Sequence, residues 1–222
     1  KRDCCIHKGK IKIMTKKIMF NDKYCLTRAV LNGSKTMTRR KLTLTLDKNV
    51  AGKLIRVYPS KVFFDNGKWL FDYEGRTYNL PKENYPRYGV DEVVAIAQSY
   101  KTIYDELTDK DGEEAANEWW CNAHESIGGS PDTSGGNNNK MFVKADLMLH
   151  HIRITDVKVE RLQDISDDDI MREGVWQFYD NKNLFYVSKN IGYAPDVAFL
   201  SAREAFWYLI DNISGKGTWE SN

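Results

Sequence analysis

Apolar positions along this chain recur at helical spacing in some segments and at strand spacing in others, which predicts an α+β fold. The segment before Gly33 has helical spacing, and Asn21 or Asp22 can cap its start. Gly33 is expected to end this helix, because glycine readily adopts the left-handed conformation that follows a helix. Two further helices are expected over residues 166–174 and 201–213, each beginning at a serine cap.

Strand-like runs dominate residues 54–80, where turn signals at residues 65–67 and 74–75 predict a β-meander. The continuous apolar run of residues 93–97 predicts a buried strand. Residues 141–147 and 152–162 are two further strand candidates.

The composition changes between residues 101 and 139, which predicts an insertion within a single domain spanning residues 18–222. A helix is expected over residues 113–126, followed by a loop rich in glycine, serine and asparagine. Residues 1–17 are expected to be a basic N-terminal arm, either disordered or not native. A helix followed by glycines usually leads into another element, so we expect the natural protein to continue past Asn222.

The net charge of the chain is too small to produce the strong positive field that is typical of nucleic-acid-binding proteins. Lysine and arginine total 33 against 31 acidic residues, a formal net charge of +2, so any anion site must be local. A hydrophobic content of 41% is enough for a substantial core. The chain has no apolar run long enough to cross a membrane and no signal-peptide segment, so we expect a cytoplasmic protein without a membrane partner.

Cysteine and histidine spacing predicts neither a metal site nor a disulfide framework, and no cofactor is expected. The four cysteines show no paired ligand spacing and are expected to be structural thiols. His150 and His151 are adjacent in a strand pattern, so their side chains would point to opposite faces and could not share one metal ion.

The segment from Gly33 to Arg40 concentrates reactive side chains. Lys35 and Thr38 can supply a base or cation and a nucleophile, while Arg39 and Arg40 suit a phosphate or carboxylate. The alternative is an ordinary solvated strand, because the alternating pattern continues to residue 46. On a strand Lys35 and Thr38 would face opposite sides, so joint chemistry requires the backbone to bend or Lys35 to lie in the preceding turn.

A second candidate is Glu173, in the last turn of the short helix that Ser166 caps and Gly174 ends. A carboxylate is disfavoured at a helix C-terminus, and an acid placed against local preference is a mild indication of function. The alternative is a surface glutamate beside Arg172.

Gln98 and Tyr100 stand at the end of the predicted buried strand, where polar side chains commonly line a site. They are therefore candidates for binding a substrate or RNA. The alternative is that these residues only end the strand, and the sequence favours neither interpretation over the other.

The pattern Gly33-x-Lys35-x-x-Thr38-x-Arg40 resembles the signature of the ASCH superfamily, and residues 162–174 resemble its second block, a short helix ending in Glu-Gly. The chain is also similar to ASCH-like proteins of gut bacteria and their phages. This resemblance implies a PUA-like mixed β-barrel with flanking helices in a cytoplasmic protein.

One branch of that superfamily, the small amidohydrolases that deacetylate acetylcytidine, uses a lysine, a threonine and a glutamate. Matched by motif, these are Lys35, Thr38 and Glu173. One hypothesis makes Lys35 the base acting on Thr38, with Glu173 orienting the pair. In another, Lys35 stays cationic and stabilises the oxyanion while Glu173 moves protons. The chain departs from many relatives in carrying Ala97-Gln98 in place of Arg-Glu, which bears on the substrate.

The competing function is a non-catalytic module that binds RNA or a nucleotide. PUA-like barrels commonly bind RNA, and Arg39 and Arg40 could hold a phosphate while an aromatic side chain stacks on a base. The sequence supports the two functions nearly equally. It slightly favours the amidohydrolase, because all three reactive residue types are present.

Overall fold

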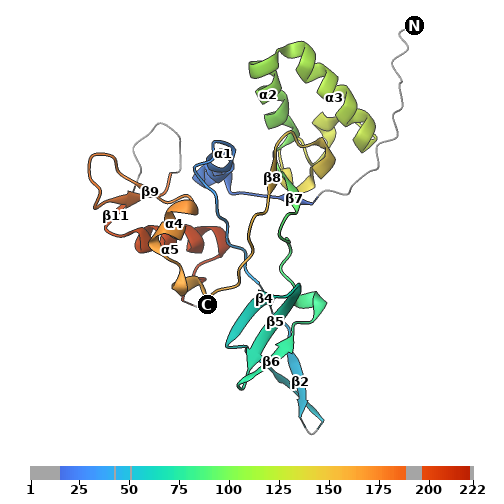
Figure 1. Cartoon of the computed structure of the whole chain (residues 1–222). Helices are drawn as coiled ribbons and strands as arrows, with labels where there is room; N and C mark the ends of the chain where they lie inside the picture. The colour runs from blue at the N-terminus through green and yellow to red at the C-terminus, as the bar shows by residue number, and fades with distance from the viewer. Residues whose placement is uncertain (1–15, 43, 51, 189–196, 221–222) are drawn as a thin grey trace. The chain divides into compact units, whose positions relative to one another are not determined.

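The computed structural model describes residues 16–42, 44–50, 52–188 and 197–220, and these residues form an α+β structure (Figure 1). Within these ranges the strands form four small sheets, and no sheet closes into a barrel. The chain divides into two compact units, one containing residues 93–153 and the other residues 20–92 and 154–222. The first fifteen residues of the predicted basic arm lie outside the described residues.

The first unit is built on a mixed sheet with the strand order β1-β7-β8. These strands are β1 (Lys17–Ile18), β7 (Val93–Ile96) and β8 (His151–Arg153). β7 runs parallel to β1 and antiparallel to β8, so it receives hydrogen bonds on both edges. Residues 94–97 are buried, which confirms the buried strand predicted from the apolar run. The strand candidate at residues 152–162 is much shorter than predicted, because only its first residues pair with β7.

Two antiparallel helices, α2 (Tyr100–Asp111) and α3 (Glu113–Ile127), complete the first unit and include most of the predicted insertion. α3 confirms the predicted helix, whereas α2 was not predicted. Gly112 separates them with φ of 91°, a conformation that favours glycine. Both Trp119 and Trp120 pack against the core of this unit.

The strand predicted at residues 141–147 is wrong, since this segment forms two 3-10 turns, η4 (Lys140–Phe142) and η5 (Ala145–Leu147). Its backbone groups bond within these turns and to side chains instead of to a neighbouring strand. Lys17 Nζ donates to the carbonyls of Met141 and Val143, both at 2.6 Å. The hydroxyl of Tyr100 accepts a hydrogen bond from the backbone N–H of Lys144 at 3.0 Å.

The second unit contains the predicted β-meander. Its strands are β2 (Asp47–Val50), β3 (Lys53–Arg56), β4 (Lys61–Asp65), β5 (Lys68–Tyr73) and β6 (Arg76–Asn79). Two-residue turns at Asn66-Gly67 and Glu74-Gly75 have positive φ throughout, as tight antiparallel hairpins require. One face buries Val62, Trp69 and Phe71 in a shared apolar cluster.

The predicted extension of the signature into a strand at residues 43–46 is wrong for the described residues 44–46, because β2 begins only at Asp47. The reason lies in the buried side chain of Asn84. It accepts from the backbone N–H of Thr45 at 2.6 Å and donates to the Thr45 carbonyl at 3.1 Å, so an amide side chain occupies the groups that a partner strand would use.

The helices of the second unit confirm the predicted caps at Ser166 and Ser201, whereas Asn21 caps a 3-10 turn and the helix that follows begins after Cys25 without a side-chain cap. These helices are α1 (Leu26–Leu31), α4 (Asp167–Arg172) and α5 (Ala202–Ser214). Asn21 caps the 3-10 turn η1 (Asp22–Tyr24) directly before α1, and Ser166 and Ser201 cap α4 and α5. A small antiparallel sheet beside α5 comprises β9 (Trp176–Gln177), β10 (Phe185–Tyr186) and β11 (Ala198–Phe199).

Three more 3-10 turns complete the described elements, namely η2 (Lys82–Asn84), η3 (Pro131–Thr133) and η6 (Leu162–Asp164). Of the helices in the described residues, none is long and apolar enough to span a bilayer.

Candidate functional site

The signature segment is a loop joined to two helices rather than a strand. The backbone N–H of Lys35 donates to the carbonyl of Ala29 in α1 at 2.8 Å. The next two N–H groups, of Thr36 and Met37, both donate to the carbonyl of Arg172 at the end of α4, each at 3.1 Å. The predicted alternation of faces therefore does not apply, and the path of the loop is set by the ends of α1 and α4.

Lys35 and Glu173 form a buried ion pair. Lys35 Nζ lies 2.7 Å from Glu173 Oε2 and donates a second hydrogen bond to the Glu173 backbone carbonyl at 2.5 Å. Both residues are only 4% exposed. The lysine thus serves as a partner for a helix-terminal carbonyl as well as for the carboxylate.

The end of α4 fixes the position of Glu173. Its backbone N–H donates to the carbonyls of Asp169 and Ile170, so the residue continues the helix as its C-cap. Gly174 then turns the chain with φ of 100°. A Cβ atom at Gly174 would lie 2.9 Å from Leu26 Cδ2 and 3.7 Å from Lys35 Cδ, so glycine allows the close approach of α1 and the signature loop.

Arg39 binds the other side of the Glu173 carboxylate. Its Nη1 lies 3.1 Å from Glu173 Oε1, and its Nη2 bonds to Glu160 Oε1. The guanidinium also lies 5.9 Å from the centre of the Phe206 ring. Its Nε is buried and has no hydrogen-bond partner among the described residues. The role of Arg39 in binding substrate stays a prediction, and an external anion would have to compete with these carboxylates.

Lys35, Glu173 and Arg39 form a cluster of bonded charged side chains, here called the Lys35 cluster. Three further charged residues surround it, namely Lys158, Asp169 and Arg172. Lys158 Nζ lies 2.7 Å from Asp169 Oδ2 and 3.2 Å from Glu160 Oε2, and Arg172 Nη1 lies 3.6 Å from Asp169 Oδ1. The hydrogen bond from Lys158 holds the pKa of Asp169 below its ordinary value, and the same bond raises the pKa of Lys158. Asp169 therefore remains ionised at neutral pH and offsets part of the local positive charge.

Burial lowers the pKa of Lys35 below its ordinary value of 10.5, although the charge and hydrogen bond of Glu173 act in the opposite direction. Desolvation penalises the charged ammonium, which is the condition that allows a lysine to act as a base. The same carboxylate that orients the lysine therefore also limits how far its pKa falls.

Thr38 lies farther along the same loop and is half-buried. Its hydroxyl makes no hydrogen bond to any described residue, so it is not bonded to Lys35 or Glu173. Arg40 is exposed, with its guanidinium 5.6 Å from the centre of the Phe20 ring. The structure thus joins the side chains of Lys35, Glu173 and Arg39 by direct contacts, and the Thr38 hydroxyl takes no part in them. Arg40 Nη1 donates to the backbone carbonyl of Arg39 at 3.4 Å.

Gln98 and Tyr100 lie in the other unit, where both are buried. Gln98 Nε2 donates to Glu106 Oε2 at 3.0 Å, and Glu106 Oε1 lies 2.6 Å from His150 Nε2. Burial tends to raise the pKa of Glu106, but the hydrogen bonds from Gln98 and His150 hold it below its ordinary value. Burial raises the pKa of Tyr100, whose ring packs directly over Gly136. Their predicted part in substrate binding is not tested by this geometry.

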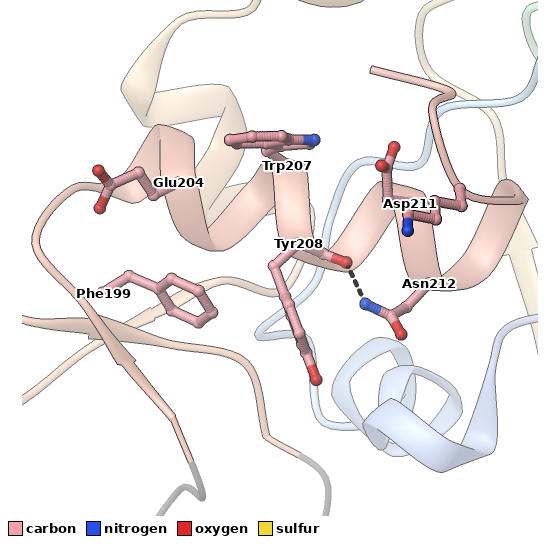
Figure 2. Close-up of a pocket in the computed structure, with 7 residues that line it drawn as sticks. Phe199, Glu204, Trp207, Tyr208, Asp211 and Asn212 are labelled. Carbon is pink, nitrogen blue, oxygen red and sulfur yellow. Dashed lines mark hydrogen bonds between the residues drawn. The ribbon is translucent and has the colours of Figure 1, made fainter. Parts of the chain in front are cut away.

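A cavity that sequence reasoning missed lies on α5, and Figure 2 shows its lining. It shares no lining residue with the Lys35 cluster. The available signal was Trp207, an aromatic residue outside the apolar face that Phe206 and Leu209 define on the same helix. Among all the described residues, no group of three or more histidine, cysteine, aspartate or glutamate side chains is arranged to hold a metal ion.

No protein-family model, curated protein or solved structure was found to match the chain.

Proposed function

We propose that this chain is an ASCH-type protein of the cytoplasm that acts on a modified nucleoside or RNA, as an amidohydrolase removing an acyl group from acylated cytidine. The observation that supports it is the buried contact of 2.7 Å between Lys35 Nζ and Glu173 Oε2, on the loop that also presents Thr38. The proposal includes a PUA-like arrangement of the small sheets, although the described strands form no closed barrel.

In the proposed reaction, neutral Lys35 removes the proton from the Thr38 hydroxyl as its oxygen attacks the acyl carbonyl carbon. The new C–O bond forms a tetrahedral intermediate, and the C–N bond to cytidine then breaks. The proton on Lys35 passes to the departing amino nitrogen. Water subsequently cleaves the threonine ester and releases the carboxylic acid.

Glu173 holds Lys35 in place for these steps, and Arg39 stabilises the carboxylate from its other oxygen at 3.1 Å. The lowered pKa of Lys35, caused first by burial, favours its role as the base over a purely cationic role. Lys35 must turn from Glu173 toward Thr38 during the reaction, because Thr38 is not bonded to the pair in the resting structure.

The alternative function is non-catalytic binding of RNA or a nucleotide. The observation that favours it is the exposed position of Arg40 and Lys41, which follow the cluster directly. Their positive charges suit a phosphate. A binding module would need Arg40 more than Lys35.

Incubation with acylated cytidine nucleosides, and then with acylated RNA, tests the proposal. Wild type is expected to release free cytidine, and Lys35→Ala and Thr38→Ala are each expected to lose about 100-fold or more in rate. Lys158→Ala is the matched control, because it removes an exposed lysine from the same charged cluster. Absence of turnover, together with salt-sensitive RNA binding that Arg39→Ala/Arg40→Ala abolishes, would reverse the ranking in favour of the binding module.

A further inference from the structure

The cavity on α5 has a volume of about 550 Å³ and is lined mainly by aromatic and charged side chains. The rings belong to Phe199, Trp207 and Tyr208, and the charged groups to Glu204, Asp211 and Lys216. Figure 2 shows Glu204, Trp207, Tyr208 and Asp211 projecting from α5, with Phe199 contributed by the neighbouring strand β11. The volume lies within the range of small-molecule sites.

Two of the rings, those of Phe199 and Tyr208, are held against each other before any ligand arrives. The opposite face of α5 buries Phe206 and Leu209, which fixes the helix in the core. Phe199 pairs with Phe185 of β10, and its ring centre lies 5.3 Å from that of Tyr208 at an interplanar angle of 45°. A rigid aromatic wall loses little conformational freedom on binding.

Trp207 is 42% exposed, although it is the largest apolar side chain on this face of the helix. An amphipathic helix normally places charged or polar residues on its solvent side. The exposed indole therefore gives the cavity a π face that packing does not use.

The charges in the cavity favour a positive ligand. Asp211 accepts hydrogen bonds from the backbone N–H groups of Trp219 at 3.0 Å and Gly217 at 2.9 Å, and these hold its pKa below the ordinary value. Glu204 adds a second carboxylate, and Lys216 is the one basic residue in the lining. Because aromatic faces are also negative, the cavity opposes a phosphate and attracts a cation.

We propose that this cavity binds an organic cation, a substituted ammonium group attached to an apolar body. Ring faces and carboxylates together recognise such a group, since a substituted ammonium carries its charge on an apolar surface. A bare metal ion would need several converging ligands, and the described residues contain no group of three or more histidine, cysteine, aspartate or glutamate side chains that could hold one. The cavity exceeds the size of one ammonium group, which leaves room for the apolar body.

Calorimetric titration of the whole chain with choline tests this site. The comparison ligand is the neutral isostere of choline, in which a tert-butyl group replaces the trimethylammonium group. Choline is expected to bind about tenfold more tightly than the isostere, because only the charged form gains from the rings and carboxylates. Equal affinity of the two ligands, or no binding of choline, would overturn the proposal.

Two variants locate the binding. Trp207→Leu removes the exposed π face, and Glu204→Gln removes a charge while keeping an acceptor for the backbone N–H of Leu200. Each is expected to weaken choline binding about fivefold or more. Tyr179→Leu is the matched control, because this tyrosine is 96% exposed and does not line the cavity, and it is expected to bind as wild type does. Unchanged affinity in both cavity variants would contradict the assignment.

The site is independent of the proposed hydrolase function. Lys35→Ala is expected to retain choline binding in full, because Lys35 does not line the cavity. Loss of binding in Lys35→Ala with a wild-type circular dichroism spectrum would contradict the assignment of the ligand to α5.

Discussion

Lys35 Nζ donates hydrogen bonds to both the carboxylate and the backbone carbonyl of Glu173, at 2.7 and 2.5 Å, across 138 positions of the chain. Because the two contacts are made by one ammonium group, the signature loop is joined to the end of α4 as well as to a charged side chain. The pair is therefore expected to affect the stability of the fold as well as any chemistry at the site.

Breaking this pair by changing one partner is expected to be strongly destabilising. Lys35→Met leaves the Glu173 carboxylate buried without its lysine, and Glu173→Gln leaves a buried ammonium without its counter-charge. Each change is expected to lower the free energy of unfolding by about 3 kcal/mol, measured by urea denaturation. The double variant is expected to lose clearly less than the sum of the two.

Lys158→Met is the control for this cycle, because its ion pair with Asp169 has a lysine side chain that is 45% exposed. Solvent screens such a pair, so the loss is expected to stay within about 1 kcal/mol. Additive effects of the two changes at Lys35 and Glu173 would contradict the proposed coupling.

Stability is expected to rise with pH in the alkaline range because of Lys35. Burial holds its pKa in the folded chain below the ordinary value of 10.5, so between these two pKa values the unfolded chain binds a proton that the folded chain does not. Raising the pH through this window therefore increases the free energy of unfolding of wild type relative to Lys35→Met.

The comparison with Lys35→Met is needed because Tyr100 acts in the opposite direction. Burial raises its pKa above 10.0, so its contribution to stability is lost as the pH rises past that value. This loss occurs in both proteins and cancels in the difference. Parallel stability curves for the two proteins would show that the pKa of Lys35 is not lowered by folding.

Gly174→Ala is expected to destabilise the chain more than Gly33→Ala. Both glycines have positive φ, of 100° and 77°, so alanine strains the backbone by about 1–2 kcal/mol at either position. Only at Gly174 would the new Cβ also lie 2.9 Å from Leu26 Cδ2. An additional loss of about 1 kcal/mol is expected there in thermal or urea unfolding, and equal losses would show that the close approach is unimportant.

The pH–rate profile distinguishes the two possible roles of Lys35. If neutral Lys35 is the base, activity rises with pH through its folded pKa. Glu173 raises that pKa, so Glu173→Gln is expected to move the rise to lower pH. A profile with an unchanged midpoint would remove Glu173 from the control of proton transfer.

The sequence was sufficient to predict elements whose signals are local. The caps at Asn21, Ser166 and Ser201 lie next to the backbone groups they satisfy, and the meander follows from alternation and two glycine turns. Whether the strands form the predicted PUA-like barrel depends on how separate sheets associate. The pairing of small sheets depends on contacts between distant segments, which alternation within one segment does not encode.

The errors have a common physical cause, which is a distant side chain or helix end bonding to the backbone. Asn84 occupies the backbone groups of Thr45, and Lys17 binds the carbonyls around Met141, so neither segment forms its predicted strand. The binding role of Arg39 stays a prediction, and its position among acidic residues from a later part of the chain could not be deduced from the signature alone.

The most direct measurement is the kcat/KM for acetylcytidine of Thr38→Val compared with Thr36→Val. The two variants make the same change in the same loop, but only Thr38 is the proposed nucleophile. We expect turnover by wild type, a loss of about 100-fold or more in Thr38→Val, and a change within about twofold in Thr36→Val. No turnover by wild type, or equal activities in the two variants, would contradict the proposed hydrolase function.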